Sequence, residues 1–386
     1  MRILHISTNY KPVGVKVGHG GVERVVLWLS EEQTRKGHET AIATHHSSTV
    51  LNAIKVFPDN IIELQSTDPR RAEALMDDAY EALFRIVSGG KWDIVHDHMG
   101  GFSVFLSRSH SKSRIPLVIS CYSQITNKPY TEIYSTLEIV RETFPWATIV
   151  ASSNSHRSHL SRILLADFTV HLAVPEEELE RGEAARAFLN MAIVRPEKQQ
   201  LELACLAGRH GIPFIFAGPV LRIDSASSAY ADSFLAEVGA IVPIEGLSVG
   251  EAESAVEAAL DRNKSVYVGE VSDPELRTLL FRLATKVVLL NSSDEVFSLV
   301  VLESLSRGVP AVAGPFSSAY EALQGFGDVV SGLQPEDIIF ALKTRARDRS
   351  AIQAFSRSRY SLSKWADTWD AVYLEAFHKF KIINYA

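Results

Sequence analysis

Short apolar runs alternate with amphipathic segments along most of the chain. This alternation is typical of an α/β fold, in which buried parallel strands are followed by helices. In the first half we expect strands at residues 3–6, 41–44, 94–96, 117–121, 148–151 and 168–171. In the second half we expect them at residues 191–194, 213–217, 265–268, 287–290 and 311–313. The pattern therefore predicts two successive sheets.

Helical spacing is clearest at the two ends of the chain. After the first strand, apolar residues recur on one helical face, and Gly37 follows where that helix would end. Residues 249–260 have the pattern of a further helix. The last segment, residues 364–380, predicts a helix with a buried aromatic face. The apolar positions of the first and last helices are Val22, Val25, Val26 and Leu29, and Trp365, Trp369, Val372, Tyr373 and Ala376.

The length of 386 residues favours two domains, because a single hydrophobic core seldom serves so long a chain. We place the boundary near Val174, where a charged stretch over residues 175–186 begins. This stretch is interpreted as a connection between domains, and the alternative is an exposed helix within one domain.

The amino-acid composition limits the classes of binding partner and the cellular location that we expect. The chain is 46% hydrophobic and 22% charged, with a formal net charge of −7, so no basic excess favours nucleic acid or an anionic membrane. No window reaches the roughly 18 apolar residues that span a bilayer, and no signal peptide is evident. We therefore expect a cytoplasmic protein without stable membrane insertion. Cys121 and Cys205 lie in apolar stretches and are expected to be reduced, without a disulfide.

A glycine turn follows the first strand. Gly20 and Gly21 stand where the first helix begins, and backbone N–H groups and the helix dipole at such a position favour a phosphate. The loop matches neither the Walker pattern nor the dinucleotide fingerprint, because Glu23 occupies the place of the third glycine. Anion binding is one interpretation, and a flexible strand-to-helix turn is the other.

The second half carries two glutamates across a predicted helix start. A helix is expected over residues 298–307, with Glu295 just before it, Glu303 on it, and Gly308 closing it. Two such carboxylates can accept hydrogen bonds from sugar hydroxyls while the helix N-terminus receives a phosphate. In the alternative, Glu295 only complements the helix dipole and Glu303 is exposed. Apolar neighbours of Glu303 argue against its exposure, namely Val300, Val301, Leu302 and Leu305.

With these motifs in order, the chain resembles the retaining GT-B glycosyltransferases of family 4. The likeness rests on the Gly20-Gly21 turn together with residues 36–39, on residues 92–98 ending in a histidine, on the glutamate pair followed by residues 308–310, and on the aromatic segment 365–373. It extends over nearly the full length.

The resemblance implies two Rossmann-like domains facing across a cleft. Residues 1–173 would form the acceptor domain, completed by a C-terminal helix over 364–386 that crosses back to it. Residues 174–363 would form the donor domain. The implied activity moves a sugar, with retention of configuration, from a nucleotide-diphosphate donor to a carbohydrate, lipid-linked or secondary-metabolite acceptor. A homodimer is left open.

The resemblance also implies roles for particular residues. His98 would lie beside the transferred sugar, Lys198 would neutralise the diphosphate, and Glu295 would contact the sugar. No metal or other cofactor is expected, because there is no Asp-x-Asp motif and the His96-x-His98 spacing is weak evidence for a metal site. The donor-binding set is Gly20, Gly21, Arg195, Lys198, Glu295, Phe297, Ser298, Leu299 and Glu303, with Glu303 on the ribose.

Some positions depart from the family pattern. Ile193 stands where an arginine is usual, and Arg195, two residues along the same expected strand, is the candidate substitute. Ser298 replaces a glycine, and residues 218–269 form a longer region than expected. The alternatives are a noncatalytic nucleotide-sugar-binding subunit and a sugar-nucleotide epimerase or sucrose-phosphate-synthase-like enzyme of the same fold. Acceptor choice is expected to reside in loops 11–19, 45–55 and 124–129.

Overall fold

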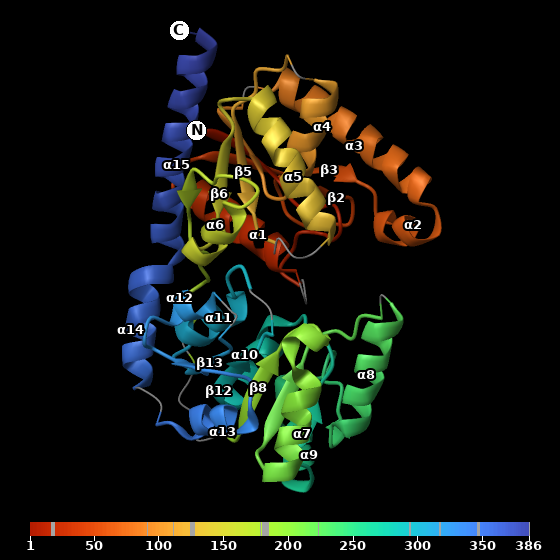
Figure 1. Cartoon of the computed structure of the whole chain (residues 1–386), viewed down its shortest axis with the longest axis vertical. Coiled ribbons are helices and arrows are strands. Elements are labelled where there is room, and N and C mark those ends of the chain that lie inside the picture. The colour runs from red at the N-terminus through yellow and green to blue at the C-terminus, as the bar shows by residue number, and fades with distance from the viewer. Residues whose placement is uncertain are drawn as a thin grey trace. The chain divides into compact units, whose positions relative to one another are not determined.

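The computed structural model consists of two compact units (Figure 1). Unit 1 contains Met1–Ala173 and Leu362–Ala386, and unit 2 contains Val174–Ser361. The chain thus passes between the units after residues 173 and 361, compared with 173 and 363 expected from the sequence. The structure describes residues 1–16, 20–90, 92–110, 112–123, 128–177, 179, 185–222, 224–292, 295–315, 318–345 and 348–385.

Unit 1 is built on a parallel seven-stranded sheet in the order β3-β2-β1-β4-β5-β6-β7. Strand order reverses between β1 and β4, and in open α/β sheets ligands bind outside the carboxyl ends of the strands at this switch point. The strands are β1 (Arg2–Ile6), β2 (Glu39–His45), β3 (Ala53–Phe57), β4 (Ile94–Asp97), β5 (Leu117–Cys121), β6 (Thr148–Ala151) and β7 (Phe168–Thr169).

Helices flank this sheet and bury its apolar strands. The first helix ends as its sequence predicts, because Gly37 follows it with φ +89°, a conformation that glycine adopts without strain. The helices of unit 1 are α1 (Gly21–Arg35), α2 (Ile61–Thr67), α3 (Pro69–Gly89), α4 (Gly101–Ser109), α5 (Lys128–Thr143), α6 (Asn154–Leu160) and α15 (Leu362–Tyr385).

The C-terminal helix α15 belongs to unit 1, where it contacts α1 and β5 (Figure 1). Its apolar stripe is buried as the spacing predicts, including Trp365, Trp369 and Tyr373. Trp369 packs against His96 with ring centroids 4.5 Å apart, and Phe380 packs edge-on against Trp146. The last segment of the chain therefore completes the core of the first unit.

Unit 2 repeats the architecture with the strand order β10-β11-β9-β8-β12-β13-β14, all pairs parallel. Its switch point lies between β8 and β12, and the predicted α/β class with two sheets is confirmed. The strands are β8 (Ala187–Met191), β9 (Phe214–Ala217), β10 (Ala240–Ile241), β11 (Ser265–Tyr267), β12 (Ala284–Leu289), β13 (Ala311–Ala313) and β14 (Asp328–Val329). The helices are the 3-10 turn η1 (Pro196–Lys198), α7 (Gln200–His210), α8 (Ser225–Glu237), α9 (Val249–Arg262), α10 (Pro274–Leu283), α11 (Leu299–Ser306), α12 (Ala319–Leu323), α13 (Pro335–Lys343) and α14 (Arg349–Tyr360).

The expected strand at residues 191–194 is wrong, because β8 ends at Met191. Asn190 interrupts the apolar pattern of β8, yet its side chain is buried and donates to the carbonyl oxygen of Val288 at 2.8 Å. A polar residue satisfied in this way is compatible with a buried strand. The short strands β10 and β14 were not expected, and β3 overlaps residues 45–55, which were interpreted as a loop.

The charged stretch 175–186 lies within unit 2, so the interpretation as a connection between domains is not supported for its described part. The backbone N–H of Val174 donates to the carbonyl oxygen of Tyr360 at 3.2 Å, and Val174 forms a bridge with Ser361. The two passages of the chain between the units therefore lie side by side. Residues 178 and 180–184 lie outside the described residues.

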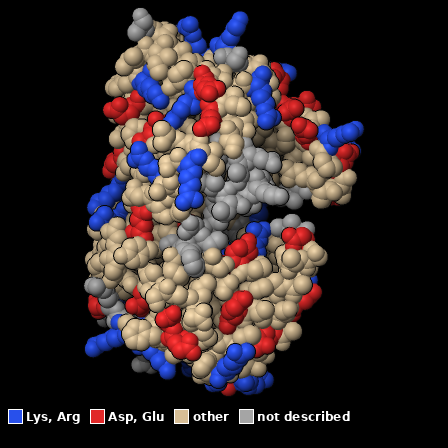
Figure 2. All heavy atoms as spheres, in the orientation of Figure 1, with Lys and Arg blue, Asp and Glu red and all other residues tan. Residues whose placement is uncertain are grey.

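Three features that the composition predicts can be compared with the structure, namely the mixture of surface charges, the lack of a long apolar helix among the described residues and the state of the cysteines. On the face drawn in Figure 2, the described lysines and arginines are interspersed with aspartates and glutamates. Within the described chain, no helix combines the length and the apolar character that a membrane crossing requires. Cys121 and Cys205 are free thiols.

We predict that Trp369→Ala destabilises the protein by about 3–5 kcal/mol, because a large side chain that is 1% exposed would leave a cavity beneath α15. Unfolding in urea, followed by tryptophan fluorescence and circular dichroism, measures the change. Glu375→Ala, at an exposed position of the same helix, is the control and should leave the unfolding midpoint in place. Equal midpoints for the two variants would contradict the packing of α15.

Candidate functional site

Polar side chains gather at the switch point of each sheet. In unit 1, β1 and β4 pair in a register that places His5 beside His96. His98 follows directly after β4. All three side chains are fully buried. Because the carboxyl ends of parallel strands meet at one edge, the alternating strand geometry places these three rings together.

Hydrogen bonds join the three histidines to side chains from other elements. His5 Nδ1 lies 3.0 Å from His98 Nε2, and His5 Nε2 lies 2.9 Å from the side-chain oxygen of Gln33 on α1. His98 Nδ1 lies 3.3 Å from the hydroxyl of Tyr122, whose ring stacks on that of His98. His98 is therefore covered by Tyr122 rather than exposed.

The third histidine, His96, is held by two hydroxyl groups. Its Nδ1 lies 2.7 Å from the hydroxyl of Tyr373 on α15, and its Nε2 lies 2.7 Å from the hydroxyl of Ser120 on β5. Its ring also stacks on that of His98, with centroids 3.8 Å apart. The C-terminal helix thus supplies one of the groups that orient the histidine cluster.

Burial keeps these histidines neutral. Desolvation lowers the pKa of His5 to about 4, although the hydrogen bond with Gln33 opposes this shift. The pKa values of His96 and His98 are lowered well below the usual value, chiefly by burial and additionally by neighbouring histidines. At neutral pH the cluster can therefore donate and accept hydrogen bonds but carries no charge.

The three histidines lie close enough together to share a metal ion. However, each of their ring nitrogens has a hydrogen-bond partner at 2.7–3.3 Å. The rings of His96 and His98 stack 28° from parallel, and the two histidines bond to different neighbours. A shared ion would have to break these bonds, so the observed geometry favours a hydrogen-bonded network.

The glycine turn of unit 1 stands at the start of α1, where Gly20 is the N-cap residue and Gly21 the first helical residue. No side chain caps this helix end. Glu23 in the first turn is buried and accepts a hydrogen bond from the hydroxyl of Thr8. The backbone of the two glycines is thus placed as an anion site requires. Residues 17–19 of the same predicted loop lie outside the described residues.

In unit 2 the structure brings together two of the predicted donor-site residues, Lys198 and Glu295. Lys198 Nζ lies 3.5 Å from Glu295 Oε2, and the two side chains are 25% and 22% exposed. Lys198 ends η1 after β8, whereas Glu295 follows β12, so the switch point brings them together. The side-chain amide of Asn291 also donates to Glu295. A cation and a carboxylate thus meet at a partly exposed strand end.

Glu303 is buried on α11, as its apolar neighbours predict, and its partner is a residue that sequence reasoning missed. Arg277 Nη2 on α10 donates to both carboxylate oxygens of Glu303, at 3.0 and 2.8 Å. The guanidinium of Arg307 also donates to the Glu303 carbonyl oxygen at 3.1 Å. No spacing pattern relates Arg277 to Glu303, because they lie on different helices and meet only through tertiary packing.

The remaining predicted donor residues surround the start of α11 and η1. Ser298 caps α11 by accepting from the Val301 N–H at 3.4 Å, while the side chains of Phe297 and Leu299 are buried in unit 2. Arg195 precedes η1. The expectation that Ile193 and Arg195 share one face of a strand is wrong, since the chain has already left β8.

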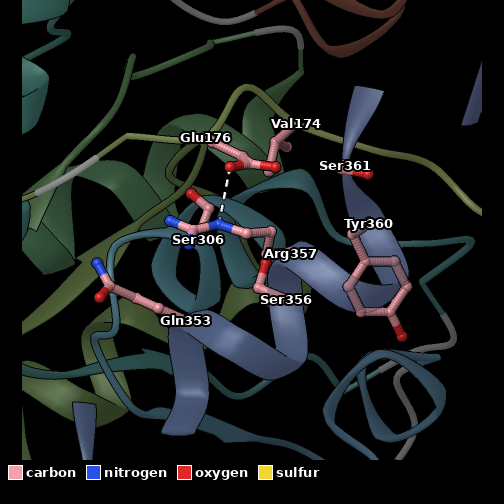
Figure 3. A pocket seen from close by; sticks show the side chains of 8 residues that line it. All are labelled: Val174, Glu176, Ser306, Gln353, Ser356, Arg357, Tyr360 and Ser361. Atoms are coloured by element: carbon pink, nitrogen blue, oxygen red, sulfur yellow. Dashed lines mark hydrogen bonds and ion pairs between the residues drawn. The ribbon is translucent and has the colours of Figure 1, made fainter. Parts of the chain in front are cut away.

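A small cavity in unit 2 lies beside the C-terminal end of α11, where Ser306 helps to line it (Figure 3). The ion pair between Glu176 and Arg357, 2.8 Å apart, crosses it, and Tyr360 and Ser361 help to line it. It has about 10 Å³ of room for the centre of a water molecule. Since this is the space for about one water, the cavity is not a sugar-nucleotide site.

A comparison with known protein families matches part of the chain. Residues 19–174 match the model of Glycosyltransferase Family 4. These residues form a glycosyltransferase family 4 domain. No curated protein sequence matches the chain. The family 4 domain occupies most of unit 1 and includes the glycine turn, His98 and Tyr122.

Solved structures extend the likeness beyond the family 4 domain. A glycosyltransferase involved in avilamycin A biosynthesis has 17% identity and a TM-score of 0.63, with 98% of each chain covered. Sucrose-phosphate synthase from Thermosynechococcus elongatus has 14% identity and a TM-score of 0.71, covering 98% of this chain and 99% of that one. Anabaena HepE in complex with UDP and glucose has 13% identity and a TM-score of 0.67, covering 96% and 99%. The predicted GT-B fold is therefore confirmed for the whole chain.

We predict that Arg277→Leu destabilises the protein by about 3–5 kcal/mol, because Glu303, whose side chain is 6% exposed, would stay buried without its counter-charge. Unfolding in urea measures the loss. The double variant Arg277→Leu with Glu303→Leu should regain most of the stability, since it removes both charges together.

The exposed pair of Arg222 and Asp232 provides a matched control, and Arg222→Leu should not shift the unfolding midpoint. A double variant as unstable as the sum of its two single variants would show that no coupling exists between Arg277 and Glu303.

Proposed function

We propose that the chain is a retaining glycosyltransferase that transfers a sugar from a nucleotide-diphosphate donor without a metal ion. The observation that carries the proposal is the approach of Lys198 to Glu295 at the switch point of unit 2. This pair is partly exposed and lies near the N-terminus of α11. The family 4 domain and the GT-B fold support the same class of reaction.

The cation and the helix N-terminus suit a diphosphate. As the bond between sugar and phosphate breaks, negative charge develops on the leaving diphosphate, and fixed positive groups lower the barrier by stabilising it. Lys198 supplies a full charge, and the N–H groups at the start of α11 supply the positive end of a helix dipole. This chemistry requires no metal ion, although an ion could serve the same purpose in other enzymes.

The two carboxylates suit the hydroxyl groups of the donor. Of the two carboxylates, Glu295 is the more exposed, and it would accept a hydrogen bond from a hydroxyl of the transferred sugar. Glu303 would accept from a ribose hydroxyl, and Arg277 donates to both of its carboxylate oxygens. Arg277 would therefore hold the ribose-binding carboxylate in place.

The acceptor is proposed to bind unit 1, whose strand ends carry the histidine cluster. The acceptor hydroxyl would attack the sugar on the face of the departing diphosphate, and a donor phosphate oxygen would take its proton. Proteins of similar structure include a glycosyltransferase involved in avilamycin A biosynthesis, a sucrose-phosphate synthase and a trehalose-6-phosphate synthase. The acceptor class proposed here is a sugar or a glycan-bearing small molecule.

We predict that one nucleotide class among UDP-, GDP-, ADP- and TDP-sugars raises the thermal stability of the wild-type protein. A ligand at about 100 times its dissociation constant adds roughly 2.7 kcal/mol. Lys198→Met should weaken donor binding by about 10- to 100-fold through loss of a charge-assisted contact, whereas Lys343→Met, on the exposed surface of α13, should bind as the wild type does.

Turnover separates the proposal from its alternatives. Incubation with the stabilising donor and a panel of sugar acceptors should yield a glycoside whose anomeric configuration, read from its proton NMR coupling, matches that of the donor. Binding without a product would favour a noncatalytic subunit, and conversion of the donor without an acceptor would favour an epimerase. No stabilisation by any of the four nucleotide classes would contradict the donor site itself.

A further inference from the structure

Asn291 is a buried amide at the carboxyl edge of the sheet of unit 2. It lies two residues after β12 and is 1% exposed. Its backbone packs closely against the end of β13, because a Cβ atom at Gly314 would come within 2.9 Å of the Asn291 carbonyl oxygen. The end of the sheet therefore holds this asparagine in place.

The orientation of the Asn291 amide follows from its partner. Its Nδ2 group donates to Glu295 Oε2, and the reverse orientation would set two acceptors against each other. Oδ1 therefore points away from the carboxylate, and it is buried with no hydrogen-bond partner among the described residues. Burying an unpaired acceptor is unfavourable for folding, whereas an apolar side chain of similar size would avoid this cost. Packing alone therefore does not explain an amide at this position.

The same oxygen of Glu295 also faces Lys198. The distance of 3.5 Å between Lys198 Nζ and Glu295 Oε2 exceeds the roughly 2.7–2.9 Å of a charge-assisted hydrogen bond. Asn291 therefore makes the directional contact with the carboxylate, and Lys198 contributes its charge. Within the described part of the chain, no residue bonds to the other oxygen, Oε1. The protein thus holds this partly exposed carboxylate by one oxygen.

Two backbone hydrogen bonds fix the surroundings of this contact. The N–H of Ser292 donates to the carbonyl oxygen of Glu197 at 2.9 Å, which ties the segment after β12 to η1. The N–H of Ser318 donates to the carbonyl oxygen of Glu295 at 3.2 Å. The main chain therefore sets where Glu295 stands, while the direction of its carboxylate depends on Asn291.

We propose that Asn291 is a positioning residue of the donor site, which holds Oε2 of Glu295 and thereby directs Oε1 toward a hydroxyl of the transferred sugar. This inference rests on the proposed function, in which Glu295 accepts from that sugar. Asn291 acts through the carboxylate and does not touch the donor. Without the amide, the carboxylate would turn more freely and would have to be ordered when the sugar binds, which costs affinity.

Calorimetric titrations with a sugar nucleotide and with its nucleoside diphosphate test this role, using the nucleotide class that stabilises the wild type. Asn291→Leu keeps the volume and removes the donor group, so we expect it to weaken sugar-nucleotide binding by about 3- to 10-fold, as for the loss of one hydrogen bond. The nucleoside diphosphate lacks the sugar and should bind as it does to the wild type. Asn291→Ala serves the same comparison if the leucine variant does not fold.

A double-mutant cycle with Glu295→Ala decides whether Asn291 acts through the carboxylate. If it does, the double variant Asn291→Leu with Glu295→Ala should bind the sugar nucleotide no more weakly than Glu295→Ala alone. Losses that add up in the double variant would show that the two residues act independently, and this result would overturn the proposal.

Asn190 provides the matched control for a buried asparagine of the same sheet. Like Asn291, it donates through Nδ2 and has no partner for its buried Oδ1 among the described residues, but its bond goes to the backbone of Val288. Asn190→Leu should therefore keep the wild-type ratio of the two affinities, although it removes a hydrogen bond from the core. An equal change of this ratio in Asn190→Leu and Asn291→Leu would reduce Asn291 to a structural role.

The nucleoside diphosphate separates this inference from the proposed function. If the wild type binds none of UDP, GDP, ADP and TDP, the proposed function fails. If it binds one of them and Asn291→Leu keeps the wild-type affinity for the corresponding sugar nucleotide, only the role of Asn291 fails. Equal weakening of both ligands in Asn291→Leu would show a general loss of the site and would also overturn the positioning role.

Discussion

Polar side chains at the ends of buried parallel strands must find hydrogen-bond partners, because an unpaired polar group out of water costs about 1–3 kcal/mol. In both units, the polar side chains at the point where strand order reverses are bonded to one another, although Gln33 Nε2 and Asn291 Oδ1 have no hydrogen-bond partner among the described residues. In unit 1, the histidines of β1 and the β4 end are bonded to one another and to hydroxyl groups from β5 and α15. In unit 2, Glu295 is held between Lys198 and Asn291, and Glu303 is held by Arg277. The candidate functional residues therefore lie where the fold requires buried polar side chains to be hydrogen-bonded.

Much of the architecture can be predicted from the sequence, because its helices have clear apolar faces and glycine stops. The start of α11 at Ser298, the burial of Glu303 and the aromatic face of α15 all follow from local spacing. Strand β8 was placed wrongly because Asn190 interrupts its apolar run, and only the carbonyl oxygen of Val288 on the neighbouring strand makes that residue acceptable in the core. Prediction from the local sequence pattern is therefore wrong where a residue distant in the sequence determines whether a polar side chain can be buried.

The same distinction separates the parts of the candidate site. Lys198 and Glu295 were each expected at the donor site, and the switch point of unit 2 places them 3.5 Å apart. The hydrogen bonds of Arg277, Gln33 and Tyr373 could not be predicted. Each of these residues bonds to a residue on a different element, and no spacing in the sequence relates the two partners. His98 was expected beside a sugar, yet it is fully buried beneath Tyr122. The half-buried Tyr122 lies over His98 at this strand edge.

The proposed function requires unit 2 to bind the diphosphate of a sugar nucleotide at Lys198 and at the start of α11. Hydrogen–deuterium exchange of the whole chain, with and without a saturating nucleoside diphosphate, tests it most directly. Backbone amides in residues 195–200 and 295–303 should exchange more slowly in the nucleotide-bound protein, because the ligand would cover η1 and the N-terminus of α11. Unchanged exchange in these two segments, with protection elsewhere in the chain, would contradict it.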